Sequence, residues 1–140
     1  MPYIDTSILV AALTNEAATL RMQIWLGEQA AGDLTISEWV ATEFSAALSI
    51  KIRMGQIEAR HRAEALAAFT RLSVYSFGTL PISGAQFRTA ARFADQHAFG
   101  LRAGDALHLA IAADHGATIV TLDRGLVTAA AALGVSARLV

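Results

Sequence analysis

The sequence predicts an α/β fold built around a parallel sheet. Short runs of aliphatic and β-branched residues alternate with longer stretches of helical periodicity along the whole chain, a pattern typical of parallel strands joined by helical crossovers. The chain has 140 residues, of which 54% are hydrophobic, which indicates a large core or an apolar partner interface. Because no repeat, linker or low-complexity segment interrupts the pattern, we predict one domain over residues 1–140.

The N-terminal quarter predicts one strand and two helices. Residues 2–4 form the first strand, and Ser7 is placed to cap a helix that begins at Ile8. A second helix is expected over residues 17–31, stopped by Gly32. The apolar residues expected on one face of this helix are Leu20, Ile24 and Trp25.

The next segment repeats the strand-to-helix order. Residues 34–36 form the second strand, Ser37 is the next capping residue, and a helix follows over residues 38–54. Gly55 ends that helix, and another runs from residue 56 to about residue 72.

The last third contains the remaining elements, bounded by serine and glycine. They are a strand at 79–82, a helix from Ser83 towards His97, a helix over 105–115 closed by Gly116, a strand at 118–122, a helix over 125–133 and a strand at 135–139.

Composition excludes several classes of protein. The net charge is −1, so no overall basic field attracts nucleic acid. Without cysteine the chain has no disulfide, thiolate metal site or cysteine nucleophile. No apolar run approaches the roughly 18 residues that span a bilayer, and Asp5 interrupts any signal peptide. We therefore expect no membrane association and a cytoplasmic setting.

Basic residues gather in the middle third of the chain. Arginines in this cluster suit bidentate phosphate contacts, but a solvated helix face balanced by Glu58 and Glu64 explains them equally well. The cluster consists of Lys51, Arg53, Arg60, Arg62 and Arg71.

Four acidic residues adjoin apolar stretches that should be core. Asp5 follows the first strand, and Asp123 follows the strand at 118–122. Asp105 opens an apolar helix, and Glu43 falls on the stripe of its helix that carries Trp39, Val40, Phe44, Ala47 and Leu48. A buried carboxylate is costly unless a proton, a partner or a metal compensates it.

The fold predicts that these acids meet. The carboxyl ends of parallel strands lie at one edge of the sheet, where ligands of such folds bind, and Asp5 and Asp123 both fall there. Clustered carboxylates are hard ligands that suit Mg²⁺ or Mn²⁺. Such ions activate a water and clamp a phosphodiester, so the predicted chemistry is phosphodiester hydrolysis.

Each acid also has a purely structural explanation. Asp5 and Asp105 are ordinary helix-capping candidates, and Asp123 is an ordinary turn residue before Arg124. An inward Glu43 is harder to explain without a partner.

The residues around these acids resemble a known family. YIDTS at 3–7, the inward Glu43, GDALHLA at 104–110 and GATIVTLD at 116–123 resemble the PIN-domain ribonucleases, and more narrowly the VapC toxins of toxin–antitoxin pairs. The most specific part is the block at 105–110 followed by 121–123.

The resemblance implies a three-layer fold, with a roughly five-stranded parallel sheet flanked by helices and an acidic Mg²⁺ site, where Mn²⁺ substitutes. Asp5 and Asp105 match the positions that bind the metal most directly, and Glu43 and Asp123 match the other two acidic positions. Thr6 and Thr121 match hydroxyls that support these carboxylates.

The resemblance also implies an RNA substrate, a homodimer and a VapB-type antitoxin that covers the site. Glu38 is a rival for the second acidic position, but it lies in the first turn of its helix, where the helix dipole stabilises it.

Other interpretations remain open. One is a non-enzymatic or inactive PIN-like binding module, and another is an aspartyl-phosphate phosphohydrolase using Asp5 as its nucleophile. Such hydrolases usually carry a second aspartate two residues later, where this chain has Ser7. The four histidines show no zinc-hydrolase spacing. We expect His108 to make a structural contact beneath the site, and the stripe of Trp25, Trp39, Phe44 and Phe69 to be mainly core.

Overall fold

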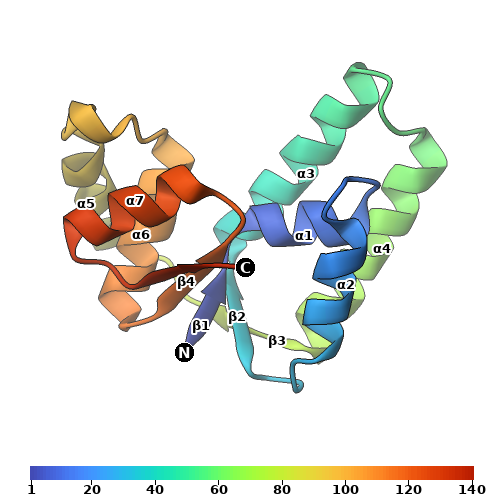
Figure 1. Ribbon diagram of the computed structural model, residues 1–140, viewed down its shortest axis with the longest axis horizontal. Helices are drawn as coiled ribbons and strands as arrows, with labels where there is room; N and C mark the ends of the chain where they lie inside the picture. The colour runs from blue at the N-terminus through green and yellow to red at the C-terminus, as the bar shows by residue number, and fades with distance from the viewer.

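The protein is described by a computed structural model that covers all residues 1–140 (Figure 1). Its five strands form one all-parallel sheet in the order β3-β2-β1-β4-β5, which confirms the predicted α/β class. The strands are β1 (Pro2–Ile4), β2 (Leu34–Ser37), β3 (Phe77–Leu80), β4 (Thr118–Thr121) and β5 (Ala137–Leu139).

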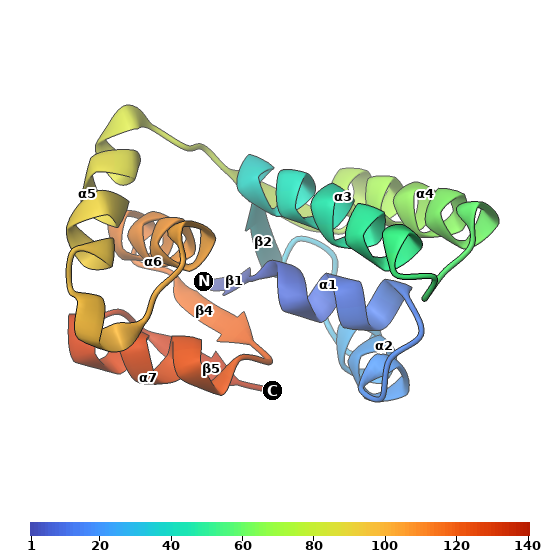
Figure 2. The ribbon, with the colours of Figure 1, turned by 90° about the horizontal axis from the view of Figure 1, so that it is seen from above.

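Helices cover both faces of the sheet, so the fold has three layers. The helices are α1 (Thr6–Leu13), α2 (Thr19–Gly27), α3 (Glu38–Arg53), α4 (Ala59–Tyr75), α5 (Gly84–Ala94), α6 (Ala103–His115) and α7 (Arg124–Leu133), with a short 3₁₀ turn at His97–Phe99. Helices α1–α4 lie on one side of the sheet and α5–α7 on the other (Figure 2).

The central strand β1 is buried between β2 and β4. Tyr3 and Ile4 are fully buried, and Ile4 pairs with Val120 of β4. One continuous core connects the two faces through residues of β1, β4 and the apolar helix α6. Because β1 and β4 are parallel neighbours, the residues that follow them emerge at the same edge of the sheet.

Three sequence-based expectations about local structure are wrong, and one of them is that Ser37 caps α3, because its side chain makes no capping hydrogen bond. Helix α2 is shorter than expected, and it buries Met22 while Leu20 and Ile24 are 69% and 55% exposed. Periodicity identified an apolar face but not what that face packs against. Ser7 does not cap α1, because its hydroxyl donates to Asp5 instead.

The remaining elements occur where the sequence predicts them, with shifted ends. Strand β3 begins and ends two residues earlier than expected, and α5 stops at Ala94 rather than continuing to His97. Helix α6 ends as expected at Gly116, which adopts a left-handed conformation with φ of 62°.

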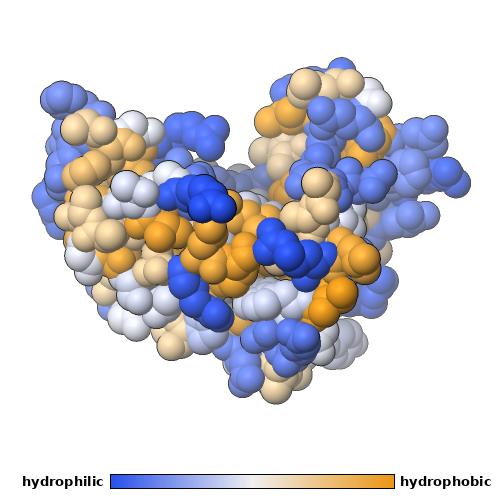
Figure 3. Space-filling model, viewed as in Figure 1, coloured by the Kyte–Doolittle hydropathy of each residue, from blue (hydrophilic) through white to orange (hydrophobic).

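The molecular surface is hollowed between the α1–α4 half and the α5–α7 half (Figure 3). None of the helices combines the length and the apolar character that crossing a bilayer demands.

Candidate active site

The acidic cleft is a cavity of about 360 Å³ between the two halves of the molecule. Its walls come from the start of α1, one face of α3 and the first turn of α6. The lining residues are Thr6, Trp39, Glu43, Ala46, Ala47, Ile50, Arg102, Gly104 and Asp105. Two of the four predicted acids, Glu43 and Asp105, therefore face the same cavity.

Asp5 lies at the end of β1 and is only 6% exposed. Its carboxylate accepts hydrogen bonds from the hydroxyls of Ser7 at 2.5 Å and Thr121 at 2.8 Å. Burial raises the pKa of Asp5, and the two hydroxyls and the charge of His108 only partly oppose that rise. The residue is thus a buried acid whose negative charge lacks full compensation.

Glu43 is fixed by contacts from two other elements. Thr6 donates to its Oε1 at 2.7 Å, and His108 Nε2 lies 2.5 Å from the same oxygen. Burial by itself raises the pKa of Glu43, but the hydrogen bonds and the charges of His108 and Arg102 outweigh burial and lower it. Glu43 is therefore an anion that the protein stabilises.

Gly104 allows α6 to approach Glu43 closely. A Cβ atom at this position would lie 2.5 Å from Glu43 Oε2 and 3.3 Å from the indole nitrogen of Trp39. That nitrogen is buried and has no hydrogen-bond partner. Oε2 of Glu43 consequently faces the backbone of α6. Thr6 and His108 contact the other oxygen, Oε1.

Asp105 lies in the first turn of α6 but does not cap the helix, because the N-cap position is Arg102. Its Oδ2 is 3.5 Å from the Arg102 Nε, and the Arg102 side chain is 85% exposed. An exposed pair of this kind contributes little to stability, so the Asp105 carboxylate is held only weakly by Arg102.

Asp123 serves as the N-cap of α7. Its Oδ1 accepts hydrogen bonds from the backbone N–H groups of Gly125 at 2.8 Å and Leu126 at 3.2 Å. Its own N–H donates to Thr121, whose hydroxyl donates to Asp5. Thr121 therefore links Asp123 to Asp5, although neither acid lines the acidic cleft.

Asp5 and Asp123 are linked through Thr121, and Glu43 and Asp105 share the acidic cleft, but the four acids do not form a ready-made ligand set. No three acidic or histidine side chains are arranged to hold one ion together. Chemically the residues fit a divalent cation, because carboxylate oxygens are the ligands that such ions prefer. A cation would also compensate the charge of Asp5, whose pKa burial raises. Their role as metal ligands stays a prediction.

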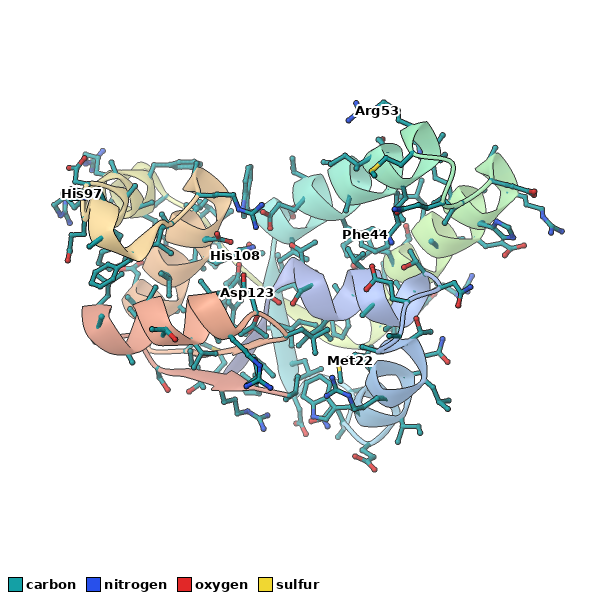
Figure 4. All side chains as sticks on the ribbon, turned by 45° about the horizontal axis from the view of Figure 1, so that its top comes forward. Met22, Phe44, Arg53, His97, His108 and Asp123 are labelled. Atoms are coloured by element: carbon teal, nitrogen blue, oxygen red, sulfur yellow. The ribbon has the colours of Figure 1, made fainter.

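Sequence reasoning missed several polar contacts beneath the site. The Tyr3 hydroxyl contacts both Ser37 and His108, and all three side chains are buried. A tyrosine inside an otherwise aliphatic strand was the available signal, because a buried hydroxyl needs a partner. Figure 4 shows the labelled His108 and Asp123 between α1 and the α5–α7 half.

The expectations for His108 and the aromatic stripe agree with the structure in part. His108 is a buried structural contact beneath Glu43. Phe44 and Phe69 stack in the core with centroids 4.8 Å apart, whereas Trp39 lines the acidic cleft.

A five-stranded parallel sheet with acidic side chains at its carboxyl edge defines a class of α/β proteins that bind ligands beyond their strand ends. The chain matches the PIN domain model over residues 3–132 and belongs to the PIN domain family. Members of this family are generally nucleases that use a divalent metal. No curated protein matches the chain in sequence.

Solved structures share this fold at low sequence identity. VapC20 of Mycobacterium tuberculosis, described as a Sarcin-Ricin loop cleaving toxin, is 19% identical with a TM-score of 0.69, over 96% of both chains. FitAcB of Neisseria gonorrhoeae is 19% identical with a TM-score of 0.66, over 98% of this chain and 96% of that one. VapBC-5 of M. tuberculosis, a member of the VapBC family of toxin–antitoxin systems, is 19% identical with a TM-score of 0.55, over 99% and 96%.

Proposed function

We propose that this protein is a Mg²⁺-dependent endoribonuclease that acts as the toxin of a type II toxin–antitoxin pair. The observation that carries this proposal is the incompletely compensated carboxyl group of Asp5 at the end of the central strand, one residue from Thr6, which holds Glu43 at the acidic cleft. A divalent cation bound here would compensate the charge of the buried carboxyl group, and the PIN domain family to which the chain belongs supports a metal-dependent nuclease.

The four acids have distinct parts in this proposal. All four serve the metal site: Asp5 and Asp105 bind the ion most directly, and Glu43 and Asp123 supply the other two carboxylates. Thr121 holds the Asp5 carboxylate and Thr6 holds that of Glu43. When bound, Mg²⁺ or Mn²⁺ activates the attacking water and stabilises charge on the phosphodiester.

The structural neighbours support the biological part of the proposal. One neighbour is described as cleaving the Sarcin-Ricin loop, and another belongs to a toxin–antitoxin system. By analogy, we propose an RNA substrate in the cytoplasm, a VapB-type antitoxin as partner, a homodimer, and one nuclease domain over residues 1–140.

The direct test is RNA cleavage by the purified protein with Mg²⁺, Mn²⁺, Ca²⁺ or EDTA. Cleavage is expected with Mg²⁺ and Mn²⁺ and not with EDTA. Ca²⁺ should fail because its looser geometry positions the attacking water poorly. Asp5→Asn should be inactive and the exposed Asp33→Asn fully active.

Three results would overturn the proposal. Cleavage that survives EDTA or the Asp5→Asn substitution would remove the metal site from the mechanism. RNA binding without cleavage under every ion would favour a binding module. Hydrolysis of a small phosphate monoester through a phosphorylated Asp5 would instead favour the phosphohydrolase.

A further inference from the structure

A buried chain of hydrogen bonds runs beneath the acidic cleft from the sheet to Glu43. The Ser37 hydroxyl is 2.9 Å from the Tyr3 hydroxyl, which is 2.7 Å from His108 Nδ1. On the other side of the ring, His108 Nε2 reaches Glu43 Oε1. The four side chains come from β2, β1, α6 and α3, so the fold has to assemble the chain of contacts.

Every donor and acceptor in this chain has a defined partner. Since the Glu43 carboxylate only accepts, the hydrogen must be on His108 Nε2. The Tyr3 hydroxyl can donate or accept, so it can pair with His108 Nδ1 whether or not that nitrogen carries a hydrogen. The imidazole ring is therefore held at both nitrogens and its orientation is fixed.

Ser37 takes part in these hydrogen bonds instead of capping α3. Ser37 occupies the N-cap position of α3 with extended backbone angles, but its side chain makes no capping hydrogen bond. Its hydroxyl contacts Tyr3 instead. A serine at this position ordinarily stabilises its helix, so the Tyr3 contact has replaced the usual role of the residue.

The two carboxylate oxygens of Glu43 therefore have different surroundings. Oε1 receives both protein contacts, from Thr6 and from His108. Oε2 has no side-chain donor and lies against Gly104, the one position in α6 where no Cβ atom blocks it. A flexible glutamate is thereby held with one oxygen occupied and one free at the cleft.

We propose that His108, held by Tyr3, is a positioning residue that occupies Oε1 of Glu43 and leaves Oε2 for the divalent cation. This inference rests on the proposed metal-dependent function and adds two residues to it. Partners that orient a metal ligand typically change metal affinity about 10–100-fold when removed. A network that served the fold alone would change stability and leave affinity unaltered.

The experiment measures Mn²⁺ affinity by calorimetry or electron paramagnetic resonance, which needs no RNA substrate. Tyr3→Phe keeps the buried ring and removes only the hydroxyl that holds His108. It should weaken Mn²⁺ binding about tenfold while the protein still unfolds cooperatively. His108→Gln should weaken binding at least as much. Tyr75→Phe, at a tyrosine that is 77% exposed, is the matched control and should change nothing.

A double-mutant cycle separates positioning from general stabilisation. In a Glu43→Gln background, the further Tyr3→Phe change should have no additional effect on Mn²⁺ affinity, because the carboxylate that Tyr3 helps to orient is gone. An equal loss in both backgrounds, or a lower melting temperature with unchanged affinity, would overturn the inference alone. A wild-type protein that binds no Mn²⁺ would overturn the metal-dependent function itself, and the inference with it.

Discussion

Asp5 is the residue at which burial and charge conflict most directly. It is 6% exposed, and its pKa is raised by burial from the ordinary value of 3.8. Because the native pKa exceeds the unfolded one, ionised Asp5 lowers the free energy of unfolding at any pH above its native pKa. That cost disappears below the unfolded pKa, where both states are protonated.

Asp5→Asn should therefore stabilise the metal-free protein. Asparagine keeps one accepting oxygen, and its amide donates to the second hydroxyl. In EDTA the melting temperature of Asp5→Asn should exceed that of the wild type near neutral pH, and the gain should shrink as the pH falls towards 3.8. Asp33→Asn, at an exposed aspartate, should show no such gain. A lower melting temperature across the pH series would mean that the Asp5 anion stabilises the fold.

Gly104→Ala tests the close approach of α6 to Glu43 without removing an acid. The new Cβ atom would lie 2.5 Å from Oε2, and Thr6 and His108 restrain the carboxylate from moving away. We expect Mn²⁺ affinity and RNA cleavage to fall at least tenfold, with some loss of stability because Glu43 must shift from its partners, partly offset because alanine is the better helix former. Gly27→Ala in α2, where nothing lies within 4 Å, should be neutral. Full activity in Gly104→Ala would show that Oε2 need not occupy this position.

At the scale of elements, helix caps show where the site overrides local preference. The predicted cap at Ser83 forms with its Gln86 partner in α5, in a helix remote from the acids. Ser7 and Ser37 also precede or open helices, yet neither caps one. The Ser7 hydroxyl contacts Asp5 and accepts from the backbone N–H of Leu122, and the Ser37 hydroxyl contacts Tyr3. Leu122 and Tyr3 are far away in the sequence, so local sequence rules do not include them.

Asp123 caps α7 in addition to its proposed role at the metal. It caps α7 through two backbone N–H groups, so Asp123→Ala should lower the free energy of unfolding in EDTA by about 1 kcal/mol. Asp123→Asn should keep the cap and nearly all of the stability, because asparagine caps equally well. Both variants should lose activity if the carboxylate also serves the metal. Equal stability of the two variants in denaturant titrations would contradict the capping role.

At the scale of the whole molecule, the sequence predicted the class of fold and all five strands, but not their spatial order. Periodicity is local, whereas the contacts that build the site join residues far apart, such as Thr121 with Asp5 and His108 with Glu43. The four acids were found because charge beside apolar runs is visible in a sequence. Tyr3 and Gly104 were missed because their importance depends on which element packs over them.

The surface of the whole molecule also predicts self-association. Large apolar side chains remain exposed on several helices, among them Leu20 and Ile24 of α2 and Tyr75 of α4. A chain with 54% hydrophobic residues has more apolar surface than its core takes up. We expect a homodimer, with a mass near twice the 14.8 kDa of one chain in light scattering and further complex formation with the product of a neighbouring antitoxin gene. Because apolar association depends only weakly on ionic strength, the dimer should persist in high salt. A protein that stays monomeric at high concentration and does not bind that gene product would contradict both the homodimer and the antitoxin complex.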